Sequence, residues 1–276
     1  MIIDLHNDLL TAKHRDKWND ELCSYKAADA KTALAVWTTE LRPTAEDMAR
    51  FAEFGSIQSP GIAIEDLGSV VTDDFDTLFK LCSPIYASLT WNGDNRLAGG
   101  CGCEKPVTKL GLSVIESMAK YGVALDLSHL SDTAFFDALD KCRGKVLVTH
   151  TASRRLSDHP RCITDDMAKK CAERGGIIGV AAVPNFLDSS LIYGENTDRK
   201  KYALHIAHFA SVVGCDCVAI GTDFNGCEYY PRGMESYADF SALAEDMRGL
   251  GFSGAETDKI FYGNAERFFG LAKENL

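Results

Sequence analysis

Short runs of apolar and β-branched residues recur along the chain and alternate with stretches in which apolar residues follow helical spacing. This alternation is typical of a parallel sheet built from strand–helix units. The predicted strands are Ile2–Leu5, Leu34–Thr38, Gly61–Ile64, Ile85–Thr90, Val123–Leu127, Val146–Thr149, Ile177–Val183 and Val218–Gly221. The clearest predicted helices are Leu110–Tyr121, Asp132–Lys141, Asp165–Arg174 and Tyr202–Val213. Eight strands alternating with helices predict an α/β fold of the (β/α)8 TIM-type barrel class.

The length of 276 residues fits one large domain, because α/β barrels commonly reach this size. Hydrophobic residues make up 46% of the chain and charged residues 25%, which is enough apolar material for a sizeable core. No repeat, low-complexity tract or linker divides the sequence. We therefore expect a single barrel domain over residues 1–276, with long loops at Gly99–Gly102 and Asn225–Ser236.

The net charge of −11 argues against a nucleic-acid partner, which would require clustered Lys and Arg. No apolar stretch is long enough to span a bilayer, the first residues do not resemble a signal peptide, and residues 272–276 are not an apolar tail. Ten cysteines in such a chain indicate reduced thiols. The pairs Cys101-Gly-Cys103 and Cys215-Asp-Cys217 lack the spacing of zinc knuckles, so we expect ordinary loop and core thiols. These features predict a cytoplasmic protein with no membrane partner.

Ionisable residues follow five of the eight predicted strands directly. They lie in His6-Asn7-Asp8, Glu65-Asp66, Ser128-His129, Thr149-His150 and Thr222-Asp223. The carboxyl ends of barrel strands all open on one face, where barrel enzymes carry their active sites. Because successive strand residues point to opposite sides, His6 and Asp8 share one side and can both face the barrel mouth.

Histidines and carboxylates gathered in this way form a nitrogen and oxygen donor set suited to zinc or a similar divalent ion. Any single histidine would more often be an ordinary buried or surface residue. Several buried carboxylates converging on one face, however, are costly without a cation. The set therefore predicts a metal site, in which Glu65 could bridge two ions.

The remaining histidines lack this placement. His205 and His208 share one helical face at i, i+3, which favours a packing or surface role. His14 follows no predicted strand. His159 precedes Pro160 in a loop, and we expect it to support the site without binding metal.

Seven motifs in this order resemble the renal or membrane dipeptidases, a family of the amidohydrolase superfamily of metal-dependent barrels. They are His6-Asn7-Asp8, Ile64-Glu65, Leu125–His129, Val148–Arg154, His159-Pro160-Arg161 with Asp165-Asp166-Met167, Ile220–Phe224 and Gly263-Asn264. Each motif is moderately specific, and the ordered set, which spans nearly the whole chain, is highly specific.

The resemblance implies a binuclear zinc centre and a small dipeptide substrate, sometimes with a D-residue at its C-terminal position. It assigns roles as follows: His6 and Asp8 bind one zinc ion, His129 and His150 the other, Glu65 bridges them, Asp223 shuttles the proton, and Arg161 grips the substrate carboxylate. General chemistry then predicts that a zinc-bound hydroxide attacks the scissile carbonyl. The family often forms homodimers, which makes a homodimer possible here.

The sequence departs from the family after the fourth strand. Well-studied members carry a histidine there, thought to help hold the tetrahedral intermediate, whereas this chain has Trp91 in Leu89–Asn95. An indole can donate one hydrogen bond but cannot accept a proton. Trp91 is either a substrate-binding residue that stacks on the substrate or an ordinary packing aromatic. Two alternatives therefore stay open, namely the same metal centre acting on another small amide or a lactone, and a catalytically idle barrel that binds metal or peptides.

Overall fold

The computed structural model describes residues 1–10, 18–55, 60–192 and 195–271, so His14 and residues 272–276 lie outside the described part. Eight parallel strands close into a barrel in which each strand pairs with the next along the chain and β8 pairs with β1. The strands are β1 (Ile2–Asn7), β2 (Ala30–Trp37), β3 (Pro60–Glu65), β4 (Tyr86–Ser88), β5 (Ala124–Asp126), β6 (Val146–Thr151), β7 (Ile178–Val180) and β8 (Val218–Ile220). The predicted (β/α)8 barrel is confirmed, and each predicted strand coincides with an observed one apart from its bounds.

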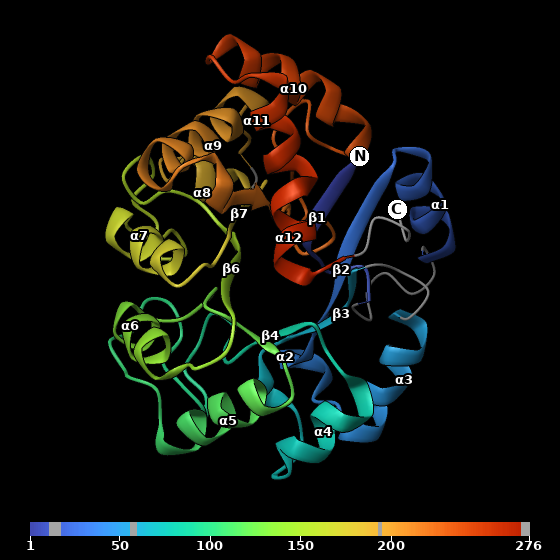
Figure 1. Cartoon of the computed structure of the whole chain (residues 1–276), viewed down its shortest axis with the longest axis vertical. Helices are drawn as coiled ribbons and strands as arrows, with labels where there is room; N and C mark the ends of the chain where they lie inside the picture. The colour runs from blue at the N-terminus through green and yellow to red at the C-terminus, as the bar shows by residue number, and fades with distance from the viewer. Residues whose placement is uncertain (11–17, 56–59, 193–194, 272–276) are drawn as a thin grey trace.

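Helices form an outer ring around the strands (Figure 1). They are α1 (Trp18–Ala27), α2 (Thr38–Leu41), α3 (Ala45–Gly55), α4 (Phe75–Cys82), α5 (Lys109–Lys120), α6 (Asp132–Lys141), α7 (Asp165–Glu173), α8 (Pro184–Leu187), α9 (Arg199–Val213), α10 (Phe240–Gly249), α11 (Gly254–Asp258) and α12 (Asn264–Phe269). The four helices expected from the sequence correspond to α5, α6, α7 and α9. None of the described helices has the length and apolar character needed to cross a membrane.

The core has an inner and an outer layer. Inside the barrel, the strands contribute mostly small and aliphatic side chains, such as Ile3 and Leu5 of β1 and Leu147 of β6. Ala265 and Phe268 of α12 pack against these residues, so α12 closes one end of the barrel (Figure 1). A larger layer of buried side chains fills the space between the strands and the surrounding helices.

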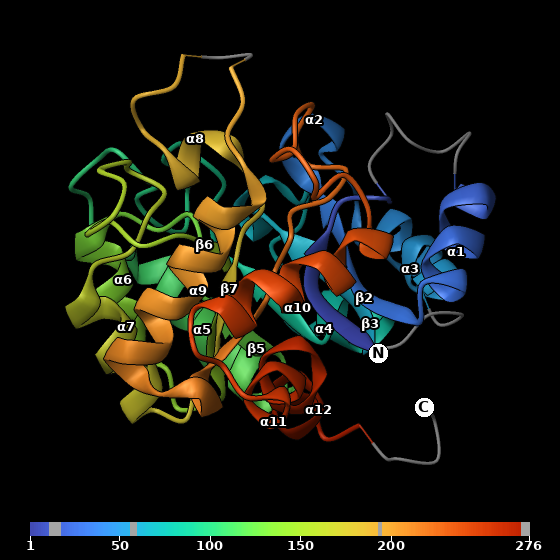
Figure 2. The same cartoon turned by 90° about the horizontal axis from the view of Figure 1, so that it is seen from above.

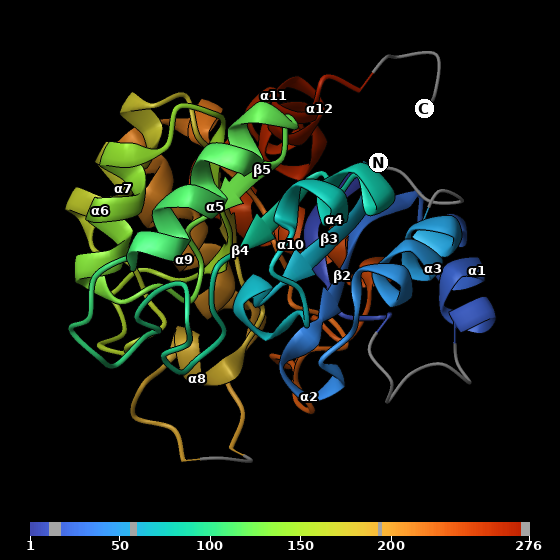
Figure 3. The same cartoon turned by 90° about the horizontal axis from the view of Figure 1, so that it is seen from below.

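The carboxyl ends of the strands open on the face opposite α12. The short helices α2 and α8, which follow β2 and β7 directly, lie on this face, whereas α11 and α12 lie at the other end (Figures 2 and 3). The long predicted loop after β8 also belongs to this face, since residues 225–229 line the cavity at the barrel mouth. The fold therefore places the polar strand ends at one opening.

Candidate metal centre and active site

Five strands deliver ionisable side chains to one buried cluster at the barrel mouth. The cluster consists of His6 from β1, Asp8 directly after β1, Glu65 from β3, His129 after β5, His150 from β6 and Asp223 after β8. The structure thus brings together all six residues that the sequence indicated as metal ligands or proton carrier. Their side chains are almost fully buried, and Asp223 is the most accessible at 13% exposure.

A shift in strand register aims β1 at the cluster. Ile3 and Leu5 both point into the barrel, so strict alternation would turn His6 outward. The pairing of β1 with β2 shifts between Asp4 and Asn7, and the His6 imidazole reaches the interior cluster. Such irregularities commonly re-aim side chains beside active sites. β6 shows the same feature between Val148 and Thr151, around His150.

The three histidines all present Nε2 to the centre of the cluster. His129 Nε2 lies 2.8 Å from Glu65 Oε1, while the Nε2 atoms of His150 and His6 lie 3.5 Å and 3.7 Å from the same oxygen. His6 Nε2 also lies 3.3 Å from Asp8 Oδ2 and 3.9 Å from Asp223 Oδ1. Glu65 therefore occupies the middle of the cluster, as a bridging carboxylate would.

The opposite nitrogen of each imidazole is held by a hydrogen-bond partner. His6 Nδ1 lies 2.9 Å from the hydroxyl of Tyr86, which donates to the Leu5 carbonyl, so His6 Nδ1 is the donor to this oxygen. His129 Nδ1 lies 3.0 Å from Oδ1 of Asn92. With Nδ1 engaged, each ring directs Nε2 into the cluster, where His129 Nε2 lies 2.8 Å from His150 Nε2.

His150 is held through a longer relay. Its Nδ1 lies 2.8 Å from the Thr149 hydroxyl, which donates to Asp126 Oδ2 at 2.6 Å. Metal-binding histidines characteristically donate their second N–H to such partners, which fix the ring orientation. The Thr149 carbonyl reaches so far into the barrel that a Cβ on Gly179 or Gly221 would lie 1.9 Å or 1.7 Å from its oxygen.

Burial dominates the electrostatics of the cluster. It raises the pKa of Glu65 well above the ordinary value and, together with the neighbouring Asp8, raises the pKa of Asp223 to about 8. Burial also lowers the pKa values of His129 and His150. His6 differs: burial is the largest single effect and lowers its pKa, but the carboxylates of Asp8, Glu65 and Asp223 together outweigh burial and raise the pKa to about 10. Three buried carboxylates sharing one small volume therefore favour a cation among them.

The donor atoms fit a divalent metal. His6 Nε2 and Asp8 Oδ1 are buried without a hydrogen-bond partner, which is unfavourable for polar atoms unless a ligand satisfies them. Two triads have their ligand atoms within 4.8 Å of one another, namely His6 with Glu65 and His150, and His6 with Asp8 and Asp223. Imidazole nitrogens and carboxylate oxygens suit zinc and similar ions. The geometry also places Asp223, expected only as a proton carrier, within reach of a metal.

A cavity of about 720 Å³ opens above the cluster. Arg161 is the only Lys or Arg among its described lining residues, and its Nε is buried without a partner. One of its terminal nitrogens donates to the His150 carbonyl at 3.2 Å, and its guanidinium lies over the Phe186 ring. Trp91 also lines the cavity, with its ring centroid 5.0 Å from that of Trp37.

The backbone is strained where two cluster residues leave their strands. His129 and Asp223 have φ values of 67° and 64°, a left-handed conformation that is unusual for residues with a Cβ. Gly226, in the loop after Asp223, packs directly on the carboxylates. A Cβ at this glycine would lie 2.2 Å from Asp223 Oδ1 and 2.3 Å from Asp8 Oδ2.

The remaining candidates lie outside the cluster. His205 is buried, accepts a hydrogen bond from the Ser153 backbone and bonds the Leu187 carbonyl, which confirms its packing role. His208 pairs with Asp165. His159 lines the cavity and accepts a hydrogen bond from the Arg161 backbone, so it supports the site as expected. All ten cysteines are free, and Cys101 lies at the cavity wall.

Several residues that shape the cluster were not predicted from the sequence. Tyr86 and Asn92, which orient histidines, and Gly226, which packs on the carboxylates, stand in no metal-ligand pattern, and their roles depend on contacts between distant parts of the chain. Thr149 and Asp126 belong to motifs that were noted, but their hydrogen bond across β5 and β6 was not foreseen. Asp126 could have been singled out from the sequence, because it is a carboxylate within an otherwise apolar strand, and buried carboxylates are rare unless they are paired.

The sequence matches a known protein family. A family model described as membrane dipeptidase, peptidase family M19, matches residues 12–275. Dipeptidase 3 of Rattus norvegicus is 30% identical over 163 residues, and that of Homo sapiens is 28% identical over 163 residues. Each alignment covers 59% of this chain but only 33% of the relative, so the match spans about a third of these relatives' length.

Solved structures share the fold along the whole chain. The dipeptidase AC, a metallopeptidase of family M19, superposes with a TM-score of 0.82 at 19% identity, covering 98% of both chains. A metallopeptidase from Rhodobacter sphaeroides, liganded with a phosphinate mimic of the dipeptide L-Ala-D-Ala, gives a TM-score of 0.81 at 19% identity and the same coverage. At this level of identity, the likeness establishes the barrel fold.

Proposed function

The chain belongs to the membrane dipeptidase family, and from this premise we propose that it is a metal-dependent dipeptidase. The proposed substrates are dipeptides with a free C-terminal carboxylate, including those with a D-residue at that position. The D-configuration is included because a similar structure was solved with a mimic of L-Ala-D-Ala.

The observation that carries this proposal is the charge pattern of the cavity. Arg161 supplies the only Lys or Arg side chain in the described lining, and its unpartnered Nε leaves donor capacity for a ligand. A guanidinium binds a carboxylate through two parallel hydrogen bonds. Arg161 also approaches the metal cluster, since it donates to the His150 carbonyl. A carboxylate held by Arg161 would therefore keep a nearby amide bond at the cluster.

We propose that two zinc ions occupy the cluster, with His6 and Asp8 at one ion, His129 and His150 at the other, and Glu65 between them. Asp223 is an additional ligand candidate at the first position. A bound divalent ion supplies Lewis acidity, which polarises a carbonyl oxygen and lowers the pKa of water. The partners Tyr86, Asn92 and Thr149 keep the imidazoles oriented for this binding.

Asp223 is the proposed proton carrier. It is the most exposed carboxylate of the cluster and lines the cavity, so its oxygens can exchange a proton with a bound substrate. Trp91 and Trp37 form an aromatic wall of the same cavity, and we propose that Trp91 stacks on the substrate. Trp91 also lies beside the His129 ring, with the two ring centroids 6.3 Å apart.

The proposal is tested by assaying L,L- and L,D-dipeptides with purified protein after chelation and after stepwise addition of zinc. Cleavage that returns with the second equivalent of zinc supports the two-metal dipeptidase. Binding of two equivalents without cleavage of any dipeptide would exclude this substrate class.

Arg161→Ala tests the mode of substrate binding. Loss of a hydrogen bond to a charged group should raise KM for dipeptides by about 10- to 100-fold. KM for the matched dipeptide amides, which lack the carboxylate, should stay unchanged. Arg154→Ala is a suitable control, because Arg154 pairs with Asp132 and does not line the cavity. An equal effect of Arg161→Ala on acids and amides would refute the assigned role.

The presence of Trp91 favours a second candidate function, in which the same metal centre acts on another small amide or a lactone. Esterase or lactonase turnover exceeding that of every dipeptide would support this candidate. A catalytically idle barrel would bind metal and turn over none of these substrates. The cytoplasmic location and the homodimer stay predictions.

A further inference from the structure

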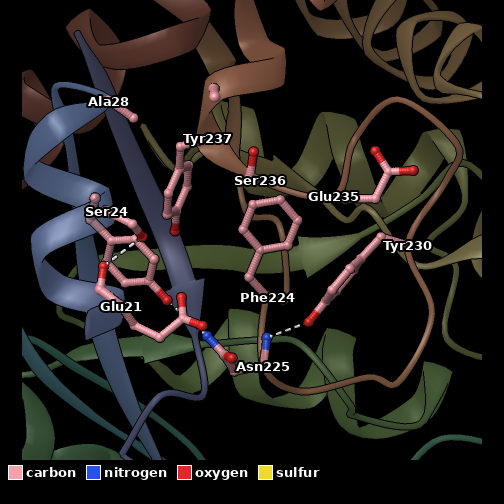
Figure 4. A pocket seen from close by; sticks show the side chains of 11 residues that line it. Glu21, Ser24, Ala28, Phe224, Asn225, Tyr230, Glu235, Ser236 and Tyr237 are labelled. Carbon is pink, nitrogen blue, oxygen red and sulfur yellow. Dashed lines mark hydrogen bonds between the residues drawn. The ribbon is translucent and has the colours of Figure 1, made fainter. Parts of the chain in front are cut away.

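A second cavity, of about 150 Å³, lies beside the barrel between α1 and the segment that follows β8 (Figure 4). None of the metal-cluster residues lines it. Its described lining consists of Glu21, Ser24, Tyr25, Ala28, Phe224, Asn225, Tyr230, Glu235, Ser236, Tyr237 and Ala238. We call this cavity the α1 pocket.

Four aromatic rings form the walls of the α1 pocket. Phe224 makes edge contacts with Tyr230 and Tyr237, with centroids 4.9 Å and 5.0 Å apart, and Tyr25 meets Tyr237 edge-on at 4.9 Å. Rings placed around one volume at these angles resemble the aromatic cages that bind organic cations. In Figure 4 the ring of Tyr237 lies on one side and that of Tyr230 on the other, with Phe224 between them.

The walls are fixed in place by their own hydroxyl groups. The Tyr25 hydroxyl accepts hydrogen bonds from Asn7 and Asn225 and also bonds the Glu21 side chain. The Tyr237 hydroxyl donates to Asp4. Because these polar groups are satisfied within the protein, the tyrosines offer the pocket mainly their rings. A preformed wall also reduces the entropy lost when a ligand binds.

The charge of the pocket has one sign. Glu21 and Glu235 contribute carboxylates, and no Lys, Arg or His is among the described lining residues. Aromatic faces carry partial negative charge as well, so both kinds of wall attract a cation. A volume of about 150 Å³ holds a molecule of the size of benzene. That is room for a methylated ammonium group but not for a dipeptide.

We propose that the α1 pocket is a binding site for a small organic ammonium ion, such as a methylated amine. The rings contact the alkyl groups around the nitrogen, and Glu21 and Glu235 neutralise its charge. Two carboxylates without further anionic ligands are a poor site for a hard metal ion, which needs six or more oxygens. Among the described residues, its lining shares only Asn225 with that of the proposed catalytic cavity.

Choline and its neutral isostere 3,3-dimethylbutan-1-ol distinguish charge recognition from simple apolar binding. Both carry nine equivalent methyl protons, so titration of the metal-loaded protein can be followed through one sharp ligand NMR signal. Choline should bind at least tenfold more tightly than the alcohol, and raising the salt concentration should weaken only choline. Equal affinity for both probes, or no binding of choline, would overturn the proposal.

Variants locate the site. Glu21→Gln combined with Glu235→Gln keeps the shape of the pocket and should raise the Kd of choline about tenfold. Glu40→Gln is the matched control, because Glu40 is a carboxylate lining the catalytic cavity instead. If Glu40→Gln weakens choline while the double variant does not, choline binds in the catalytic cavity and the proposal is wrong.

Variants of Tyr230 test whether an aromatic ring contributes to choline binding. Tyr230→Phe keeps the ring and should leave the Kd of choline within twofold, whereas Tyr230→Leu should raise it several-fold. Thermal melting checks that both variants remain folded, since the Tyr230 hydroxyl accepts a hydrogen bond from the Asn225 backbone. Unchanged choline binding in a folded Tyr230→Leu variant would contradict a cation held by aromatic rings.

Discussion

Gly226→Ala should disable the metal centre although it replaces none of the proposed metal ligands. The added Cβ would stand 2.2 Å from Asp223 Oδ1 and 2.3 Å from Asp8 Oδ2, about 1 Å inside ordinary contact. The carboxylates have little room to retreat, because Asp8 Oδ2 is already 3.3 Å from His6 Nε2 and both side chains are nearly buried. A misplacement of about 1 Å in an active site can cost about 100-fold in rate.

We therefore expect kcat/KM for dipeptides to fall about 100-fold in Gly226→Ala, and the zinc content after dialysis to fall as well. Metal analysis keeps the test valid even if dipeptides are not the substrate. Gly93→Ala is the matched control, since a Cβ there meets no atom within 4 Å in the neighbouring loop after β4. Wild-type activity and zinc content in Gly226→Ala would refute the packing argument.

Three further outcomes follow from individual contacts. Thr149→Val removes the hydroxyl between His150 and Asp126, and zinc affinity measured by chelator competition should drop about 10- to 100-fold; unchanged affinity would contradict the relay. Burial lowers the pKa of His205 to about 4, so protonation favours the unfolded chain as pH falls from 6.5 towards 4. The loss should approach about 3 kcal/mol, and urea unfolding of His205→Gln should show a shallower decline over that range; an identical decline would exclude this cause. Trp91→His should raise kcat by up to about 100-fold if the chain lacks an oxyanion donor, and an unchanged kcat would show that another group supplies it.

The barrel was predictable because its signals are local. Each strand is a short apolar run bounded by polar residues, and helices such as α5, α6, α7 and α9 begin at a capping side chain. Thr164, for example, caps α7 by accepting a hydrogen bond from the Met167 backbone. The polar strand ends were equally visible, and the geometry of a parallel barrel then forces them together at one face.

The orientation of the cluster was not predictable, because it depends on contacts between strands. Alternation alone correctly placed His6 and Asp8 on one side of β1, but it would also have turned His6 away from the interior that Leu5 faces. The register shift between Asp4 and Asn7 resolves this conflict. It arises from the pairing of β1 with β2, and no property of the residues in β1 alone specifies it.

The backbone at the ends of several strands adopts a conformation that local residue preferences do not predict. His129, Asp223 and the neighbouring Asp66 all have positive φ values, each of which costs about 1 kcal/mol for a residue with a Cβ. Glycine would relieve the strain, but it would remove an imidazole or carboxylate from the cluster in the first two cases. At Asp66, it would remove the acceptor for Asn95 and Ser69. These positions are therefore less stable locally than glycine would be, because the cluster needs their side chains. Backbone conformation predicted from residue preferences is expected to be wrong at such sites.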